Sequence, residues 1–224
     1  MLCDAEHEIE ILKNEQERIR ERYLKEAKNL SEQRCKVAKT LGSNITKALE
    51  DLNFLDVVFE MRFDVLSNYT ANGYDDAEFM ISTNPGEPVR PLGKVASGGE
   101  LSRIMLAIKT VLADQDEVET LIFDEIDSGI SGRTAQMVSE KMNLLGRSHQ
   151  IICITHLPQI AAMADAHYLI EKAVSNGATV SKIRRLDTAE TVDELSRMLG
   201  GVEITDKVRE SAREMKELAT KKKK

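Results

Sequence analysis

The sequence has few cysteines and no long apolar segment, and these two absences exclude several classes of protein. Its three cysteines, among 224 residues, are far apart and show no C-x-x-C spacing: Cys3, Cys35 and Cys153. Neither a disulfide framework nor a zinc site is indicated, so reduced thiols are expected. No apolar run approaches the roughly 18–20 residues that a bilayer span needs, and the opening MLCDAEHEIE does not have the pattern of a signal peptide. We therefore expect a cytoplasmic protein that does not bind membranes.

The composition is that of a soluble globular protein with an acidic main domain. Hydrophobic residues make up 42% of the chain and charged residues 31%, which is too apolar for a disordered protein. The net charge is −7, but residues 1–40 hold nine basic and nine acidic residues, so the excess of acids lies beyond them. Such a domain does not bind DNA through a broad basic face, although a local patch or the terminal KKKK could contact phosphates. The simplest interpretation of KKKK is a solvated tail.

The first forty residues carry a heptad pattern that predicts a coiled-coil arm over residues 1–41. Positions seven residues apart are occupied by Leu2, Ile9, Gln16, Tyr23, Leu30 and Val37. Companion positions three residues later are apolar at Ala5, Leu12 and Ile19 and polar further on, at Glu26, Gln33 and Thr40. A pattern of more than three heptads favours a coiled coil over an amphipathic helix that packs on its own domain. A partner helix is therefore implied, and nothing else in the chain resembles one.

The remaining residues, 42–224, alternate between strand and helix patterns. After Gly42 the helix is expected to resume through ITKALEDL. The expected elements after it are strands 56–63 and 77–84 around a turn-rich YTANGYDD, a loop at 84–94, helices 101–113 and 131–146, buried strands 118–125 and 149–156, an antiparallel pair at 167–174 and 178–186, and two helices from Thr188. Strand, helix, strand, helix indicates an α/β fold with a parallel sheet.

Two acids follow directly after the strand VETLIF. Asp124 and Glu125 emerge together at its carboxyl end, where open α/β sheets place their ligands. One carboxylate can hold Mg²⁺ while its neighbour orients or deprotonates an attacking water. A strand that ends in a solvated acidic turn is an equally good interpretation of this motif alone.

A histidine occupies the corresponding place after the next apolar strand. His156 ends HQIICITH and could donate a hydrogen bond to a phosphate oxygen, although by itself it is no more than a loop histidine. The other histidines have no motif around them, and we assign them no role: His7, His149 and His167.

The stretch VASGGELSR has the features of a helix start that binds an anion. Ser97 can cap the following helix, and Gly98 and Gly99 allow backbone N–H groups to approach an anion without obstruction by Cβ atoms. The helix dipole favours negative charge at that end. The alternative is a plain capped turn.

In this order, SGGELSR, LIFDE, SGISG and ITH resemble the C-terminal half of an ABC-type ATPase head. Within that superfamily the chain resembles the RecN family, bacterial DNA-repair relatives of the structural-maintenance-of-chromosomes proteins. The resemblance covers about residues 84–201, through NPGEPVRPLGKVASGGELSR, FDEIDSGISGRTAQ, ITHLPQIAAMADAHYLIEK and ELSRMLGG.

The resemblance implies a role for each residue of these motifs. The signature motif, Ser97 to Glu100, would contact the γ-phosphate of an ATP held by the opposite head. Asp124 would be the Walker B acid that holds Mg²⁺, Glu125 the catalytic glutamate and His156 the switch histidine. Residues 128–131 would form the D-loop, in which Ser128 and Gly129 face the nucleotide. Ser131 stands where transporter-type members usually carry Asp, a departure that favours the repair family.

The chain has no G-x-x-x-x-G-K-[ST] motif, so it lacks the Walker A loop that normally holds a nucleotide's phosphates. In such proteins this loop lies in an N-terminal half, joined to the C-terminal half by a long antiparallel coiled coil. We therefore expect a piece of a longer protein, inactive as an ATPase by itself. With its N-terminal half it would form a homodimer through ATP-bound heads, and it would act on DNA, close to the bacterial nucleoid.

Two other functions are compatible with the sequence. One is another coiled-coil ABC ATPase of chromosome maintenance, against which the stretch HLPQIAAMAD argues. The other is a non-enzymatic scaffold that dimerises through its coiled-coil arm.

Overall fold

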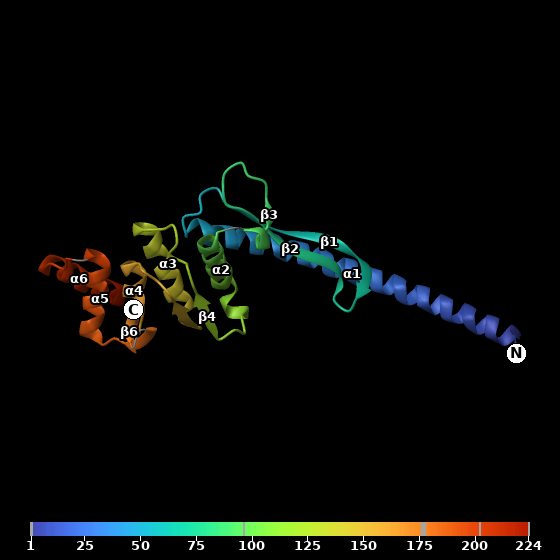
Figure 1. The fold of residues 1–224 in the computed structure, drawn as a ribbon. Helices are drawn as coiled ribbons and strands as arrows, with labels where there is room; N and C mark the ends of the chain where they lie inside the picture. Colours follow the sequence, from blue (N-terminus) through green and yellow to red (C-terminus); the bar gives the residue numbers. More distant parts are fainter. Residues whose placement is uncertain (1, 96, 176–177, 202, 224) are drawn as a thin grey trace. The chain divides into compact units, whose positions relative to one another are not determined.

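A computed structural model of the chain describes residues 2–95, 97–175, 178–201 and 203–223 (Figure 1). The centre of the expected turn SNGA, Ala96 of VASGGELSR and the last lysine of KKKK lie outside the described residues, as do the side chains of residues 2–4, 69, 173–175 and 178. The chain forms two compact units. Unit 1 comprises Met1–Lys47 and Leu55–Lys94, and unit 2 comprises Ala48–Phe54 and Val95–Lys224.

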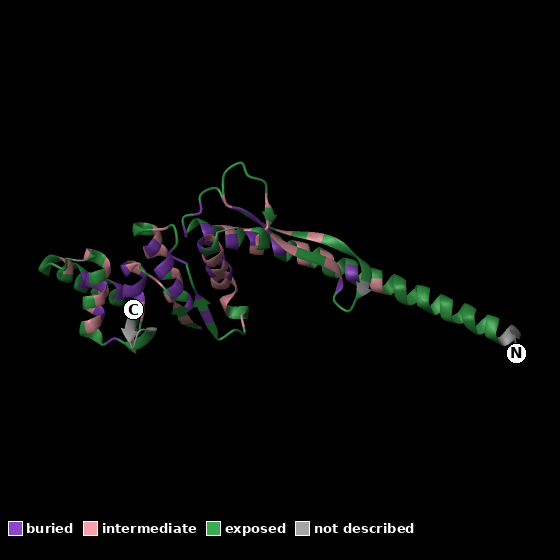
Figure 2. Ribbon diagram, in the orientation of Figure 1, coloured by how far each residue is buried: buried purple, intermediate pink, exposed green. Residues whose placement is uncertain are grey.

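A single helix, α1 (Leu2–Glu50), runs without a break through Gly42, where the sequence suggested an interruption. Packing explains why glycine stands at this position, because a Cβ atom there would lie 3.0 Å from the carbonyl oxygen of Phe59. Over its first two turns and beyond, the described apolar seam residues are exposed, among them Ile9, Leu12 and Ile19 (Figure 2). The division of the chain into an arm (1–41) and a lobe (42–224) stays a prediction.

The rest of unit 1 is a three-stranded antiparallel sheet in the order β1-β2-β3, formed by β1 (Val58–Thr70), β2 (Gly73–Ser82) and β3 (Arg90–Pro91), followed by the short helix η1 (Leu92–Lys94). Both predicted strands are confirmed, but most of YTANGYDD belongs to them and only residues 71–72 form the turn. The reason is the Asn-Gly pair, since Gly73 adopts φ +90° and permits a tight hairpin. The ion pair between Arg34 and Asp75, 2.8 Å long, ties α1 to the sheet.

Unit 2 contains the predicted α/β pattern. Its elements are α2 (Gly98–Leu112), η2 (Ala113–Gln115), β4 (Thr120–Phe123), α3 (Gly132–Leu145), β5 (Gln150–Cys153), α4 (Pro158–Met163), β6 (Tyr168–Ser175), β7 (Ala178–Arg185), α5 (Thr188–Gly200) and α6 (Asp206–Lys222). Strands β4 and β5 pair in parallel, with Phe123 opposite Cys153 at their carboxyl ends. Strands β6 and β7 form the expected antiparallel hairpin. The predicted fold class is therefore confirmed, with shorter strands than the sequence suggested.

The core of unit 2 lies between the helices and one face of the β4–β5 sheet. Leu121 and Phe123 of β4 are buried, as are Ile104 of α2 and Val138 of α3. A second cluster joins α4, α5 and α6 around the fully buried Leu195. These contacts fix the helices next to the carboxyl ends of both parallel strands.

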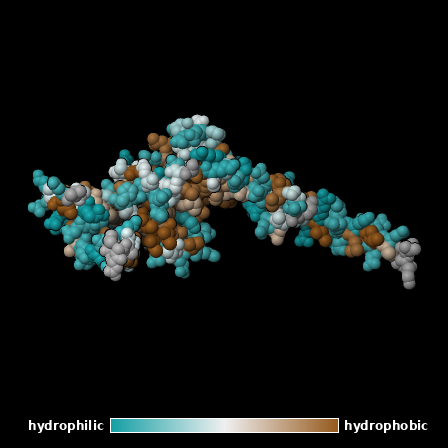
Figure 3. All heavy atoms as spheres, viewed as in Figure 1, coloured by the Kyte–Doolittle hydropathy of each residue, from teal (hydrophilic) through white to brown (hydrophobic). Residues whose placement is uncertain are grey.

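The opposite face of the β4–β5 sheet is apolar and uncovered in the part of the chain that the structure describes. Ile122 is 67% exposed, and Ile152 and Ile154 are exposed beside it. Figure 3 shows the corresponding brown patch over these strands. The sequence predicted strands buried on both faces, as parallel sheets usually are. No described residue therefore covers this face of the sheet.

Candidate functional site

The site begins at the N-terminus of α2, where the sequence predicted an anion-binding helix start. Ser97 is the N-cap residue, with an extended backbone, and its hydroxyl oxygen accepts a hydrogen bond from the N–H of Glu100 at 3.3 Å. Ser97 and Gly98 are exposed, whereas Gly99 is buried. Capping by serine satisfies one of the free N–H groups of the first turn and leaves the others open at the surface.

Beyond β4 the chain makes a compact turn, residues 124–129, which we call the 124–129 turn. Glu125 adopts φ +57°, a left-handed conformation that non-glycine residues rarely take, and Gly129 adopts φ +74°. The N–H of Glu125 donates to Oδ1 of Asp124 at 2.9 Å, and the N–H of Ser128 donates to the carbonyl of Glu125 at 2.9 Å. For a non-glycine residue such as Glu125, a left-handed φ costs about 1–3 kcal/mol, and such residues cluster at functional sites. Both carboxylates of the turn, on Asp124 and Glu125, are exposed.

The 124–129 turn packs directly against the first turn of α2, so the structure brings the two motifs together. A Cβ atom on Gly98 would lie 2.5 Å from Oε2 of Glu125. A Cβ atom on Gly99 would lie 2.8 Å from the Cβ of Ser128 and 3.0 Å from two backbone carbonyl oxygens of the turn. The presence of two glycines here therefore has an explanation that the sequence did not reveal. Without Cβ atoms, they leave room for the 124–129 turn of the same chain.

Two side chains later on α2, Ser102 and Arg103, hold the 124–129 turn in place. The Ser102 hydroxyl donates to the carbonyl of Asp124 at 2.8 Å. The buried guanidinium of Arg103 donates to the carbonyls of Ile126, at 3.2 Å, and Ser128, at 2.9 Å. Burial lowers the pKa of Arg103, but a guanidinium starts from so high a value that it stays charged. Arg103 belongs to the quoted SGGELSR stretch, yet sequence reasoning assigned it no role.

Arg103 also touches the segment that follows α1. Its guanidinium carbon lies 5.6 Å from the centre of the Phe54 ring, a cation–π contact within unit 2. The buried cation thus has an aromatic face on one side and carbonyl oxygens on the other.

A second residue that sequence reasoning missed is Asp127, which joins the two strand ends. Its side chain is buried, and its Oδ2 accepts hydrogen bonds from the Thr155 hydroxyl at 2.6 Å and from the His156 N–H at 2.8 Å. Nδ1 of His156 lies 2.9 Å from the same oxygen, while the His156 side chain is 74% exposed. The only signal in the sequence was the acidic run DEID, in which Asp127 follows the two carboxylates that were assigned roles.

The structure thus assembles most of the predicted residues in one region, at the carboxyl ends of β4 and β5. Gly98 and Gly99 lie against the 124–129 turn, and that turn contacts His156 through Asp127. Among the residues described, no three His, Cys, Asp or Glu side chains cluster as a metal cage would require. Burial raises the pKa of the Cys153 thiol to about 12, with further contributions from the charges of Asp127 and Asp124.

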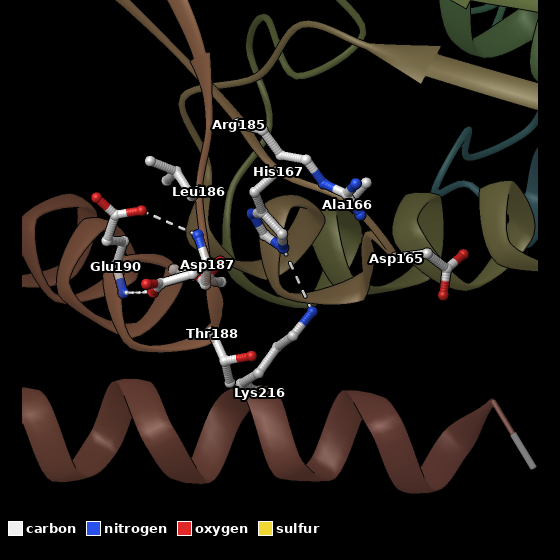
Figure 4. A pocket seen from close by; sticks show the side chains of 10 residues that line it. Asp165, Ala166, His167, Arg185, Leu186, Asp187, Thr188, Glu190 and Lys216 are labelled. Carbon is white, nitrogen blue, oxygen red and sulfur yellow. Dashed lines mark hydrogen bonds between the residues drawn. The ribbon is translucent and has the colours of Figure 1, made fainter.

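A separate depression of about 480 Å³ lies near the C-terminus and contains none of the predicted residues (Figure 4). Lys216 points into it and donates to the carbonyls of Ala162 and Ala164 at 3.0 and 2.7 Å, with His167 Nε2 at 3.3 Å. Burial, followed by the charge of Lys216, lowers the pKa of His167 to about 4. Because these polar groups satisfy one another and close the C-terminus of α4, the depression serves the structure of unit 2.

The terminal lysines also differ from the simplest expectation. Lys222 pairs with Glu140, and Lys223 pairs with Asp165. These two residues of KKKK therefore contact their own domain and are not a solvated tail. No helix in the described ranges is long and apolar enough to cross a membrane.

Comparison with known proteins places these motifs in a family. No protein-family model matches the chain. The DNA repair protein RecN of Halalkalibacterium halodurans is 45% identical over 199 residues, which cover 87% of this chain and 35% of the relative. RecN of Bacillus subtilis is 40% identical over 222 residues, which cover 92% of this chain and 38% of the relative. RecN of Treponema pallidum is 42% identical over 206 residues, which cover 89% of this chain and 36% of the relative. The chain spans about a third of the length of these relatives.

The fold agrees with that of a solved structure. The Smc head domain with a coiled coil and joint from Pyrococcus yayanosii superimposes with a TM-score of 0.58 at 21% identity, over 87% of this chain and 36% of that one. At this identity the likeness shows the fold alone, that of a head domain with a coiled coil. The relatives at 40–45% identity establish more: the chain belongs to the RecN family and matches the C-terminal region of its members.

Proposed function

We propose that the chain is the C-terminal part of an ABC-type ATPase head that works in DNA double-strand-break repair. The observation that carries the proposal is the contact between the start of α2 and the 124–129 turn, at the carboxyl edge of a parallel sheet. This edge is where α/β proteins bind their ligands. The proposal is supported by relatives that bear the name DNA repair protein RecN.

ATP and Mg²⁺ fit the residues that this edge presents. Mg²⁺ is usually held by one or two carboxylates together with waters and substrate phosphates, so the exposed carboxylate of Asp124 suffices without a cage of protein ligands. When bound, ATP would supply the phosphoryl group, and Mg²⁺ would neutralise negative charge on the phosphates. Asp124 is the residue that would hold the metal.

Glu125 and His156 would act on either side of that carboxylate. The left-handed backbone of Glu125 turns its exposed carboxylate toward the start of α2, where it can orient or deprotonate a water. His156 presents an exposed ring on a fixed backbone and can contact a phosphate oxygen. Ser128 and Gly129 lie on the exposed end of the same turn and would face the nucleotide as the D-loop.

Ser97 to Glu100 would bind the γ-phosphate of an ATP held by a second head. The start of α2 favours an anion through its dipole and free N–H groups. In the chain alone, the Glu125 carboxylate lies beside Gly98. A phosphate that docks there replaces this carboxylate, so ATP-driven pairing of two heads would free Glu125 for its work on water.

The Walker A loop would come from a further segment, either on the same polypeptide or on a separate chain. These 224 residues have no P-loop motif to hold the β- and γ-phosphates. Within the described part of the chain, Ile122, Ile152 and Ile154 leave an apolar sheet face uncovered, and the seam residues Ile9, Leu12 and Ile19 are exposed as well. Covering the sheet face with the N-terminal half of the head, and the seam with the outgoing arm, would account for both surfaces. DNA would be a partner of this complete assembly.

The experiment that tests this function supplies the N-terminal region as a second chain. By itself the chain should not bind Mg-ATP in isothermal titration. With a chain that carries the N-terminal region of a RecN relative, ATP turnover and ATP-dependent head dimers should appear, the latter by light scattering. Micromolar ATP binding and steady turnover by the chain alone would contradict the proposal, and dimers without turnover would favour the scaffold alternative.

Point substitutions in the assembled protein test the individual roles. Glu125→Gln should leave ATP binding intact and slow hydrolysis about 10²-fold or more, because a general base is lost. Asp124→Asn should weaken Mg²⁺-dependent ATP binding, and Ser97→Arg should block head dimers by placing a bulky side chain at the start of α2. Glu117→Gln, at an exposed position before β4, is the matched control and should behave as wild type. Wild-type turnover in Glu125→Gln would remove that residue from the catalytic role.

A further inference from the structure

The buried carboxylate of Asp127 is the one acid near the strand ends that the proposed function leaves without a role. Its side chain is 5% exposed, unlike the side chains of Asp124 and Glu125. A buried carboxylate is costly unless hydrogen bonds compensate it. Here two hydrogen bonds converge on Oδ2, from the Thr155 hydroxyl and the His156 N–H, and Nδ1 of the His156 ring lies 2.9 Å from the same oxygen.

Both donors come from residues 28–29 positions away in the sequence, just after the other strand of the parallel pair. The Thr155 hydroxyl in turn accepts from the N–H of Leu157 at 3.0 Å, so the start of the segment before α4 is held as well. Both the backbone and the ring of His156 are therefore fixed by one carboxylate oxygen. An exposed histidine without such an acceptor would be free to rotate.

The contact also decides which ring nitrogen faces outward. A carboxylate only accepts hydrogen bonds, so Nδ1 of His156, 2.9 Å from Oδ2, must carry the proton. The neutral ring is then the Nδ1–H tautomer, and Nε2 can donate to a phosphate oxygen only when the ring carries a second proton. In histidine sites the bond made by one nitrogen sets the state of the other.

Asp127 is itself held from the side of α2. The carbonyls of the residues before and after it, Ile126 and Ser128, both accept from the buried guanidinium of Arg103. The carbonyl of Asp127 accepts from the N–H of Ile130 at 3.4 Å. Any movement of α2 that shifts Arg103 would therefore shift the carboxylate that positions the histidine.

We propose that Asp127 is a positioning residue that fixes the tautomer and orientation of His156 and couples them, through Arg103, to the helix that starts at the signature motif. The part of the proposal that concerns ATP hydrolysis rests on the proposed function. The part that concerns the ring of His156 does not, and it can be tested on the chain alone.

The first test reads the tautomer directly by nitrogen-15 NMR of the histidine rings, at a pH where the rings are neutral. The His156 signal is assigned with a His156→Gln variant. We expect the Nδ1–H tautomer in the wild-type chain and a shift toward Nε2–H in Asp127→Ala. Thr155→Val is the matched control, because it removes another donor to the same oxygen and should leave the Nδ1–H tautomer. An Nε2–H tautomer in the wild-type chain overturns the proposal even if Asp127→Ala does not fold.

The second test uses the assembly with the N-terminal region and a double-mutant cycle. Asp127→Ala and His156→Ala should each lower kcat, the former by about 10–100-fold, as is typical when a residue that orients a functional group is lost. The double variant should be no slower than His156→Ala, because Asp127 acts through the histidine. Fully additive losses would overturn the coupling. If the wild-type assembly shows no turnover, the proposed function fails, while the NMR result still decides the role of Asp127.

Discussion

Replacing Gly99 by alanine should destabilise unit 2, although alanine is the better helix former. Gly99 lies in the first turn of α2, and its φ is not in the left-handed region, so alanine fits the backbone. Its new Cβ atom would nevertheless lie 2.8 Å from the Cβ of Ser128 and 3.0 Å from the carbonyl oxygens of Glu125 and Ser128. These neighbours belong to a turn that Ser102 and Arg103 hold in place, so they cannot withdraw easily.

The size of the change in the free energy of unfolding follows from two opposing effects of Gly99→Ala. Inserting a methyl group into a packed contact costs about 1–3 kcal/mol, and the replacement of glycine in a helix returns about 0.5–1 kcal/mol. We expect a net loss of about 1–2 kcal/mol in the free energy of unfolding, or about 2–8 °C in Tm for a chain of this size. Gly98→Ala is the control, because the only close atoms there belong to the flexible carboxylate of Glu125, which can move aside.

Urea unfolding followed by circular dichroism at 222 nm measures both variants. Gly98→Ala should stay within about 0.5 kcal/mol of wild type, as surface substitutions usually do. If Gly99→Ala proved as stable as Gly98→Ala, the packing of the 124–129 turn on α2 would not be as described, and the explanation of the paired glycines would be wrong.

Other substitutions probe the contacts that the sequence did not reveal. Arg103→Met should lower the free energy of unfolding by about 2–4 kcal/mol, since two backbone carbonyls lose a charged donor; an unchanged urea midpoint would contradict this. The pKa of His167 is lowered to about 4, so the unfolded chain binds more protons below its ordinary value of 6.5, and stability should fall between about pH 6.5 and 4. The limit is about 3.4 kcal/mol, or about 1–2 kcal/mol after allowing for solvent around the half-buried ring; His167→Gln should remove this pH dependence in acid titrations. Finally, the thiol of Cys153, with its pKa raised to about 12, should react with a disulfide reagent at pH 8 far more slowly than a free thiol, a difference that mass spectrometry measures.

The elements that were predicted well are those whose information is local. The helix over the first forty residues, the apolar strands before Asp124 and His156, and the Ser97 cap depend on residues within a few positions of one another. Where the prediction was wrong, a contact between residues far apart in the sequence decided the structure. Gly42 does not interrupt α1 but lies close to β1, where a Cβ atom would be 3.0 Å from the Phe59 carbonyl oxygen, and YTANGYDD is mostly strand because β1 and β2 pair along its length.

By itself the sequence determined the fold class, the order of the motifs and the place of Asp124, Glu125 and His156 at the ends of two parallel strands. Only the tertiary structure decided that Asp127 holds His156 and that Arg103 holds the 124–129 turn. It also decided that the two glycines of the signature motif accommodate this turn. The physical reason is that these contacts join residues 23–29 positions apart. Periodicity and capping act over one or two helical turns, whereas the partner of a buried carboxylate or guanidinium is chosen by packing.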